Sequence, residues 1–221
     1  MRKRIKTTVD VSMTVLLPLL MAYSLIGETF HEAVGTLVFV LFIVHHVLNR
    51  KWYGALFKGK YDTGRIFRTA LDMLLLVFML LQPISGILMS RHLYKFLPVL
   101  PILSKARSIH LLLAYRGYVL LCVHAGTHLT APMRKLAVRN KRIFVAFCAG
   151  SGCISAYGAA AFIKRGFPGY LSGRTMFAFF DYSEPVAFFF LDYMAIMVLF
   201  MMTGCLAVYG LSKINTRRKG M

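Results

Sequence analysis

The chain has little acid, few cysteines and no low-complexity tract or internal repeat. Only 8 of its 221 residues are Asp or Glu, against 27 Lys and Arg, and its four cysteines occur in no Cys-x-x-Cys-His sequence. That absence argues against covalent attachment of a c-type haem, and the position of the cysteines inside apolar runs argues against a disulfide framework. We expect them to be small apolar core residues: Cys122, Cys148, Cys153 and Cys205.

Apolar residues dominate the composition of the chain. They make up 58% of the chain, and the mean hydropathy is +0.64. Several runs are long enough for the about 20 helical residues that cross a bilayer. The sequence therefore predicts an all-α integral membrane bundle of about six transmembrane helices, in a single membrane domain over residues 1–221. The expected spans are 9–27, 30–49, 69–90, 107–130, 143–163 and 185–211.

The net charge of +19 comes from basic clusters between these spans. Because the bases do not line an aromatic-studded groove, nucleic-acid binding is not expected. If both termini are cytoplasmic, 19 of the 27 bases lie on the inner side, which is the positive-inside pattern. We expect a multi-pass protein of a prokaryotic cytoplasmic membrane. The inner clusters include Arg2, Lys3, Arg4 and Lys6 at the start, and Lys213, Arg217, Arg218 and Lys219 at the end.

Three helix features can be read from the local sequence. Thr29 precedes Glu32 by three residues, which is a capping-box pattern and predicts the start of the second span. The fifth span is rich in Gly, Ala and Ser, which permit close helix contact in lipid, so it is predicted to be a packing helix. The first span lacks a clear cleavage site and is predicted to be a retained helix.

Histidine carries the chemistry, because an ionisable group inside a bilayer is costly and indicates function. Six of the seven histidines lie in the second and fourth spans, and His45 follows His31 by the same 14 residues that separate His124 from His110. A step of 14 returns to within about 40° of one helix face after a rise of roughly 21 Å. If the two spans run parallel, His31 aligns with His110 and His45 with His124. The spacing predicts two bis-histidine iron sites.

Small residues on the two histidine faces support this interpretation. Gly35 lies between His31 and His45, while Ala114 and Gly117 lie between His110 and His124, and a macrocycle needs small neighbours beside its ligands. The simpler alternative is that the histidines only form hydrogen bonds between helices.

Several assignments stay open. His46 and His128 are alternatives to His45 and His124, although His46 lies about 60° off the face of His31. Arg116 either pairs with a haem propionate or reaches to the outer interface. His92 is predicted to be a solvated surface residue, and Asp72 and Asp192 to be partners of bases or backbone, with a proton relay to a quinone as the alternative.

The segments from His31 to Ala33 and from His45 to Tyr53, with the later His110 and His124, resemble the flavinylation-associated diheme membrane cytochromes. The paired spacing is also similar to the diheme core of quinol-oxidising cytochrome b proteins. The resemblance covers roughly residues 9–130. It implies a four-helix diheme core there, axial ligands His31, His45, His110 and His124, and two additional helices in 131–221. It further implies an electron carrier between the quinone pool and an extracytoplasmic flavoprotein or other redox partner.

The expected function is one-electron transfer by two non-covalent haem b groups, with a bound quinone as a further possible ligand and no catalytic side chain. Bis-histidine ligation leaves no open iron position, which suits electron transfer. The chain is then the electron-transfer subunit of a quinone-linked oxidoreductase. One alternative is a metal-ion transporter lined by histidines, which should show acidic residues among them, and Glu32 is the only close one. Another is a haem oxidoreductase acting on ferric iron or superoxide.

Overall fold

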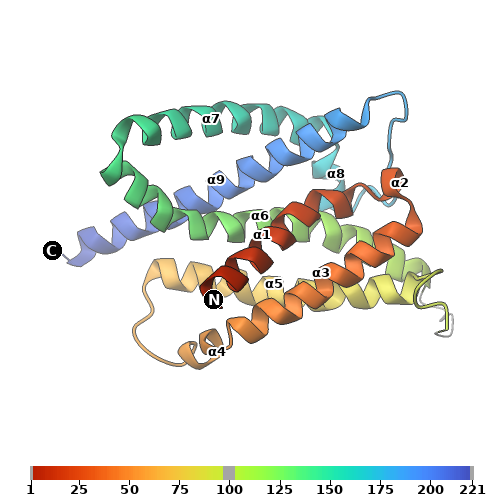
Figure 1. Cartoon of the computed structure of the whole chain (residues 1–221), viewed down its shortest axis with the longest axis horizontal. Helices are drawn as coiled ribbons and strands as arrows, with labels where there is room; N and C mark the ends of the chain where they lie inside the picture. The colour runs from red at the N-terminus through yellow and green to blue at the C-terminus, as the bar shows by residue number, and fades with distance from the viewer. Residues whose placement is uncertain (1, 97–102, 220–221) are drawn as a thin grey trace. The chain divides into compact units, whose positions relative to one another are not determined.

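A computed structural model describes residues 2–96 and 103–219. These residues are all-α, as predicted, and Figure 1 shows their helices in chain order. The helices are α1 (Arg2–Met21), α2 (Tyr23–Ile26), α3 (Glu28–Leu48), α4 (Lys51–Ala55), α5 (Thr63–Met89), α6 (Leu103–Arg139), α7 (Lys141–Lys164), α8 (Phe167–Leu171) and α9 (Val186–Lys219). Of the predicted basic clusters, the side chains of Arg2, Arg217, Arg218 and Lys219 lie outside the described ones.

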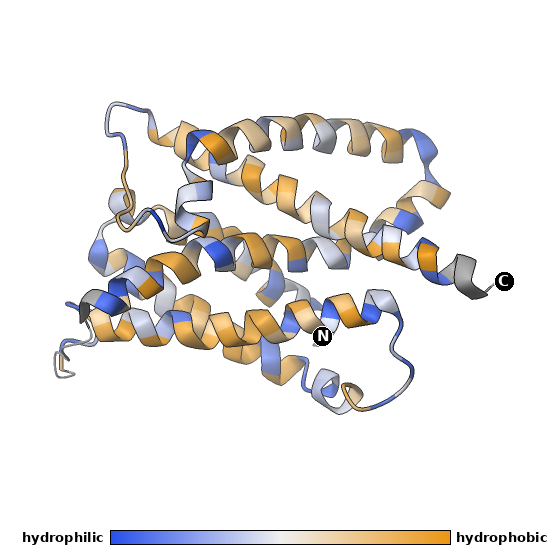
Figure 2. Cartoon of the chain, turned by 180° about the vertical axis from the view of Figure 1, so that it is seen from behind, coloured by the Kyte–Doolittle hydropathy of each residue, from blue (hydrophilic) through white to orange (hydrophobic). Residues whose placement is uncertain are grey.

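Five of the described helices are long and apolar enough to cross a membrane: α3, α5, α6, α7 and α9. Each covers one of the predicted spans. Their exposed sides are apolar, as at Leu37, Val40 and Ile43 of α3, and Figure 2 shows hydrophobic residues along the outside of the long helices. Such a surface is suited to lipid, so the chain is a multi-pass membrane protein.

The first predicted span is the exception. It falls on α1 and α2, which are separate helices on either side of Ala22. Helix α1 begins in the basic segment at Arg2 and also contains Asp10, and it is not among the five apolar helices. Its apolar part is short because charged residues occupy its first half.

The start of α3 differs from the capping-box prediction. The helix begins at Glu28 and its N-cap is Gly27, which forms no side-chain capping bond and has φ of +81°, in the left-handed region that favours glycine. The Glu32 carboxylate instead accepts hydrogen bonds from three groups that follow α5. These donors are the Ser90 hydroxyl and the backbone N–H groups of Arg91 and Leu93. The capping-box prediction was wrong because these donors hold the Glu32 side chain.

The chain divides into two compact units. One contains residues 1–59, 76–117 and 169–190, and the other contains residues 60–75, 118–168 and 191–221. In the first unit, α1 and α3 lie side by side in opposite directions and are joined through α2 (Figure 1). The face of α3 that carries Val34, Val38 and Phe42 is buried. The second histidine-bearing span begins in this unit, with residues 103–117 of α6.

Glycine allows very close helix contacts in the second unit. A Cβ at Gly126 of α6 would overlap the Met201 carbonyl of α9, and one at Gly204 of α9 would overlap the Val123 carbonyl of α6. Gly158 of α7 has the same relation to Ala195 of α9. These contacts are backbone against backbone, the arrangement that small residues permit in membranes. The Gly158 contact, the one of the three that involves α7, bears out the prediction that α7 is a packing helix.

The cysteine prediction holds only in part. Cys122 and Cys205 are buried, whereas Cys148 and Cys153 are exposed on α7, and all four are free thiols. The two exposed thiols were wrongly predicted to be core residues, because α7 packs through Ser151, Gly158 and Ala161 instead.

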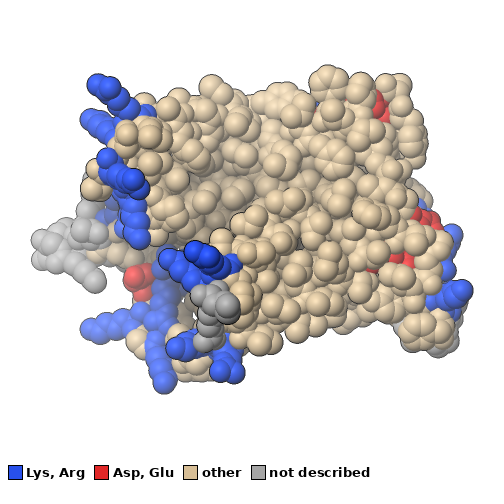
Figure 3. Space-filling model, viewed as in Figure 1, with Lys and Arg blue, Asp and Glu red and all other residues tan. Residues whose placement is uncertain are grey.

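Basic side chains gather in clusters, with broad uncharged surface between them in the view of Figure 3. The cluster around the turn from α6 to α7 consists of exposed residues: Arg134, Lys135, Arg139, Lys141 and Arg142. Asn140 ends this turn by accepting the backbone N–H of Ile143 with its side chain, which starts α7.

Candidate functional site

The structure brings His31 and His110 together in the first unit. Their ring centroids are 6.2 Å apart and the ring planes are inclined at 73°. His31 is in the first turn of α3, and His110 is in the first half of α6. Two metal–nitrogen bonds of about 2 Å, added to the radii of two imidazole rings, give roughly 6 Å between centroids. The separation is that of ordinary ring packing, as between Phe39 and Phe42 at 6.2 Å, and it is also that of two imidazoles on opposite sides of one metal ion.

Helix α5 fixes the His110 ring. The Nδ1 atom lies 3.2 Å from the Gln82 carbonyl oxygen and 3.0 Å from the Ser85 hydroxyl, which itself donates to the Gln82 carbonyl. A carbonyl oxygen only accepts, so Nδ1 of His110 carries the proton. The Nε2 lone pair then points toward the Gln82 amide nitrogen, 3.2 Å away. This is the tautomer in which a histidine binds metal through Nε2.

Two buried polar atoms at this cluster lack a partner within the described part of the chain. They are Nδ1 of His31 and Oε1 of Gln82. Buried polar atoms almost always have a hydrogen-bond partner, and an exception calls for a bound group that satisfies it. The His31 ring is also packed edge-on against Tyr23, with centroids 5.2 Å apart. Nδ1 of His31 is thus the one of these two atoms that could serve as a nitrogen ligand inside an otherwise packed site.

The glycines near the His31–His110 pair differ in what surrounds them. A Cβ at Gly86 would lie 3.3 Å from Cε1 of His110, so Gly86 permits the close approach of that ring. Gly117 is buried, yet nothing lies within 4 Å of where its Cβ would be, which leaves open space beside the helix. Gly35 instead faces Leu20 of α1 at 3.9 Å. Of the predicted small neighbours, Gly117 faces free space, while Gly35 accommodates another helix.

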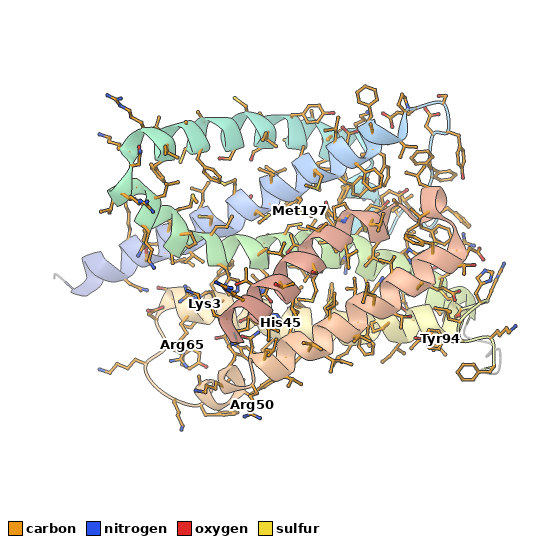
Figure 4. The ribbon with its side chains drawn as sticks, viewed as in Figure 1. Lys3, His45, Arg50, Arg65, Tyr94 and Met197 are labelled. Atoms are coloured by element: carbon orange, nitrogen blue, oxygen red, sulfur yellow. The ribbon has the colours of Figure 1, made fainter. Side chains whose placement is uncertain are left out.

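His45 is bonded to an acid from α1. Its Nδ1 lies 2.7 Å from Oδ1 of Asp10, and Figure 4 shows the His45 side chain between α3 and α1. Sequence reasoning missed Asp10. An acidic residue within an expected span was the available signal, since such a residue needs a partner in the membrane.

His124 is bonded to an acid in the same manner, in the second unit. Its Nδ1 lies 2.8 Å from Oδ1 of Asp72, which α5 contributes. Asp72 was predicted to pair with bases or backbone, and its partner is instead this histidine. His45 belongs to the first unit and His124 to the second.

The alternative ligands have other surroundings. Nδ1 of His46 lies 2.7 Å from the Tyr53 hydroxyl, and its ring packs on Phe42 with centroids 4.3 Å apart. His128 is exposed and lies edge-on against His124, with centroids 4.9 Å apart. These contacts of His46 and His128 are with a tyrosine, a phenylalanine and another histidine.

Two further candidate residues have local partners. The Nε of Arg116 donates to the Leu171 carbonyl at the end of α8, 3.0 Å away. Arg116 therefore helps to hold the segment that follows α7. His92 is a surface residue as predicted, and its Nε2 lies 3.3 Å from the Glu28 carboxylate.

Asp192 forms a different kind of cluster in the second unit. Its fully buried carboxylate binds Lys164 at 3.0 Å and Arg165 at 2.8 Å, and it also accepts the Tyr157 hydroxyl. The prediction that Asp192 is a partner of bases is confirmed. Since two cations neutralise this acid, it is an ion cluster that ties α7 to α9.

In the described ranges, no group of three or more His, Cys, Asp and Glu residues is arranged to hold a metal ion. Comparisons of the chain with protein-family models, with curated proteins and with solved structures give no match.

Proposed function

We propose that the chain is a diheme b-type membrane cytochrome that carries electrons between the quinone pool and an extracytoplasmic redox partner, such as a flavoprotein. The observation that carries the proposal is the His31–His110 pair, with its 6.2 Å separation of ring centroids. The histidines come from two helices that are long and apolar enough to span a membrane. An iron bound by both has its axial positions filled, which favours electron transfer over oxygen chemistry.

The surroundings of the pair support a haem ligand role. His110 is fixed in the tautomer that leaves Nε2 for metal, by acceptors of the kind that metal-binding histidines use. Nδ1 of His31 has no partner among the described residues, and Gly117 leaves open space next to α6. A haem held here by His31 and His110 would occupy such space and would give Nδ1 of His31 a partner. Nε2 of His110 would bind iron only with the Gln82 amide displaced from it.

We assign the second haem to His45 and His124. The support is the repeated 14-residue step and the matching hydrogen bond of each Nδ1 to an aspartate. The proposal further includes a four-helix haem core over residues 9–130. It also includes α1 as a sixth membrane span and both termini on the cytoplasmic side. Arg116 is proposed to serve a haem propionate with the guanidinium nitrogens beyond its Nε, by charge-assisted bonds. The chain supplies no catalytic side chain and acts as an electron-transfer subunit.

A second candidate is a metal-ion transporter. It is favoured by the pairing of intramembrane histidines with acids, at Asp10–His45 and Asp72–His124, because transporters use such pairs along ion and proton pathways. The haem content of the purified protein distinguishes the two candidates.

The test is a haem count on the protein purified in detergent. A pyridine haemochrome assay should give two haem b per chain, and acid-acetone should extract both because the attachment is not covalent. His110→Ala should leave one haem, while His92→Ala, a surface histidine variant, should retain two. A folded but colourless protein that binds a divalent metal ion would overturn the cytochrome and support the transporter.

A further inference from the structure

Exposed bases from three helices lie at one end of the second unit. Helices α6 and α7 contribute those around the turn that joins them: Arg134, Lys135, Arg139, Lys141 and Arg142. The C-terminal part of α9 reaches the same end (Figure 1) and adds Lys213. The Tyr209 ring of α9 lies between two of these bases, with the Arg134 guanidinium 5.9 Å and the Lys213 ammonium 4.8 Å from its centroid. We call these six bases the turn cluster.

No acidic side chain of the second unit neutralises the turn cluster. The sequence has no Asp or Glu between Asp72 and Asp181 or after Asp192, so the acidic side chains of this unit are Asp62, Asp72 and Asp192. The first accepts a backbone N–H at the start of α5, the second is bonded to a histidine, and the third binds bases at the other end of α7. Across the described ranges, no ion pair joins an acid to one of the six bases. The cluster therefore suits an anion from outside the chain.

Helix α7 places the turn cluster at the membrane surface. The helix carries bases at its two ends, Lys141 with Arg142 and Lys164, and residues 143–163 between them are uncharged. At 1.5 Å per residue this uncharged stretch is about 30 Å long, which is the thickness of the hydrocarbon core of a bilayer. Lys141 and Arg142 therefore lie at the level of the lipid headgroups. The negative charge at this level belongs to anionic lipids.

The cluster also has a shape that suits a phospholipid. Arg134, Lys135, Val138 and Arg139 line an open hollow of about 480 Å³. Val138 is 91% exposed, so an apolar side chain stands among the bases of the hollow. A guanidinium has five N–H donors and binds phosphate with two of them at once, so Arg134 can bind an oxyanion and keep its hydrogen bond to the Ser212 hydroxyl. A phosphate on the arginines and an acyl chain against Val138 would fill the hollow.

We propose that the turn cluster binds the phosphate headgroup of an anionic phospholipid, with Arg134 and Arg139 as phosphate ligands and Val138 against the acyl chain. The positive-inside bias depends on the number of bases and not on their arrangement, so it does not account for the hollow. The Asn140 side chain fixes the turn by accepting the Ile143 N–H, so the site is formed before the lipid binds. The inference goes beyond the proposed function and holds whether or not the chain binds haem.

The test is native mass spectrometry of the purified full chain with two phospholipids that have the same acyl chains. Phosphatidylglycerol has a net negative charge, and phosphatidylcholine has none. Arg134→Gln combined with Arg139→Gln should weaken phosphatidylglycerol binding about 25-fold, since each base near a membrane surface contributes about fivefold. Binding of phosphatidylcholine should not change. The parent should prefer phosphatidylglycerol by at least the factor that the double variant loses.

The matched control is Lys58→Gln combined with Lys60→Gln. These exposed lysines lie between α4 and α5, outside the turn cluster, and their loss changes the net charge by the same amount. The control should keep the parent's affinity for phosphatidylglycerol. Equal weakening in the two double variants would overturn the proposal, because binding would then depend on net charge alone. Equal binding of the two lipids by the parent would also overturn it, as would displacement of phosphatidylglycerol by excess inorganic phosphate.

A measurement on the parent alone covers the case in which the double variant does not fold. Phosphatidylglycerol with a photoreactive diazirine near the start of its acyl chain should label residues 134–142, and excess unlabelled phosphatidylglycerol should abolish this labelling. The corresponding phosphatidylcholine should show no enrichment in these residues over the exposed apolar helices. Equal labelling of residues 134–142 by the two lipids contradicts the proposal.

Discussion

The histidine-bearing helices and the last two long helices use their buried polar groups in different ways. On α3 and α6, ring nitrogens contact acids, a carbonyl or a hydroxyl, and His31 retains a nitrogen without a partner among the described residues. On α7 and α9, the buried acid Asp192 is held by two cations and a tyrosine. The first arrangement leaves a buried ring nitrogen without a partner among the described residues, and the second joins helices. Position in the membrane alone does not make a polar residue part of the functional site.

The largest effect should come from filling a backbone contact in the packing region. Gly126→Ala places a Cβ against the Met201 carbonyl, and both partners are helix backbone that cannot rotate away. Overpacking of this kind costs about 1–3 kcal/mol or more. We expect loss of most of the folded protein, measured by size-exclusion profile and thermal melting in detergent.

The control uses glycines of α7 that face open space. Gly150→Ala and Gly152→Ala meet nothing within 4 Å and should leave the melting temperature unchanged or slightly raised, since alanine favours helix. Equal melting temperatures for Gly126→Ala and these variants would show that α6 and α9 do not approach as closely as described.

A smaller loss of stability is expected at the ion cluster. Asp192→Ala leaves Lys164 and Arg165 without their carboxylate, and breaking a buried ion pair from one side is destabilising. The melting temperature should fall by several degrees, with a smaller fall in Asp192→Asn, which keeps an acceptor for Tyr157. The haem content of the folded fraction should stay at two per chain. Haem loss without a stability change would place Asp192 in the functional site.

The sequence predicted the membrane helices well because their signal is simple. Runs of apolar residues of sufficient length identified α3, α5, α6, α7 and α9, with ends extended by polar residues as at Thr63 and Lys141. The start of α3 was mispredicted, since the partners of Glu32 come from residues about 60 positions away. Helix periodicity carries no information about such contacts.

The sequence predicted that His31 lies beside His110, but not the groups that hold the histidine rings. Equal 14-residue steps on two parallel spans align His31 with His110, and the structure brings these two rings together. Asp10 lies 35 residues from His45 and Asp72 lies 52 from His124, so no local pattern links them. The hydrogen-bond partners that α5 gives the His110 ring likewise depend on how two helices pack. Long-range packing of this kind cannot be read from spacing along one helix.

Loss of one haem without loss of the fold should distinguish the predicted ligands from their neighbours. His45→Ala and His124→Ala should each remove the second haem, because each histidine is bonded to a carboxylate through Nδ1 and lies on the predicted stripe. His46→Ala and His128→Ala should keep both haems. Pyridine haemochrome counts of the four folded variants test this. The reverse pattern at His124 and His128 would overturn the ligand assignment while leaving a cytochrome.

The smallest effect is expected where a neutral acceptor supports a ligand histidine. Ser85→Ala removes the hydroxyl 3.0 Å from Nδ1 of His110, but the Gln82 carbonyl remains at 3.2 Å and still accepts the same proton. The ring therefore keeps its tautomer and orientation, and both haems stay bound. Losing one neutral bond weakens the ligand basicity slightly, so the reduction potential of the haem held by His110 should shift upward by less than that of the haem held by His124 does in Asp72→Asn, which removes a charged acceptor. Ser155→Ala on α7 is the matched control, since no hydrogen bond partner for its hydroxyl occurs among the described residues, and it should shift neither potential. A larger shift in Ser85→Ala than in Asp72→Asn would contradict the difference between neutral and charged supports, because the hydroxyl would then contribute more than the carboxylate.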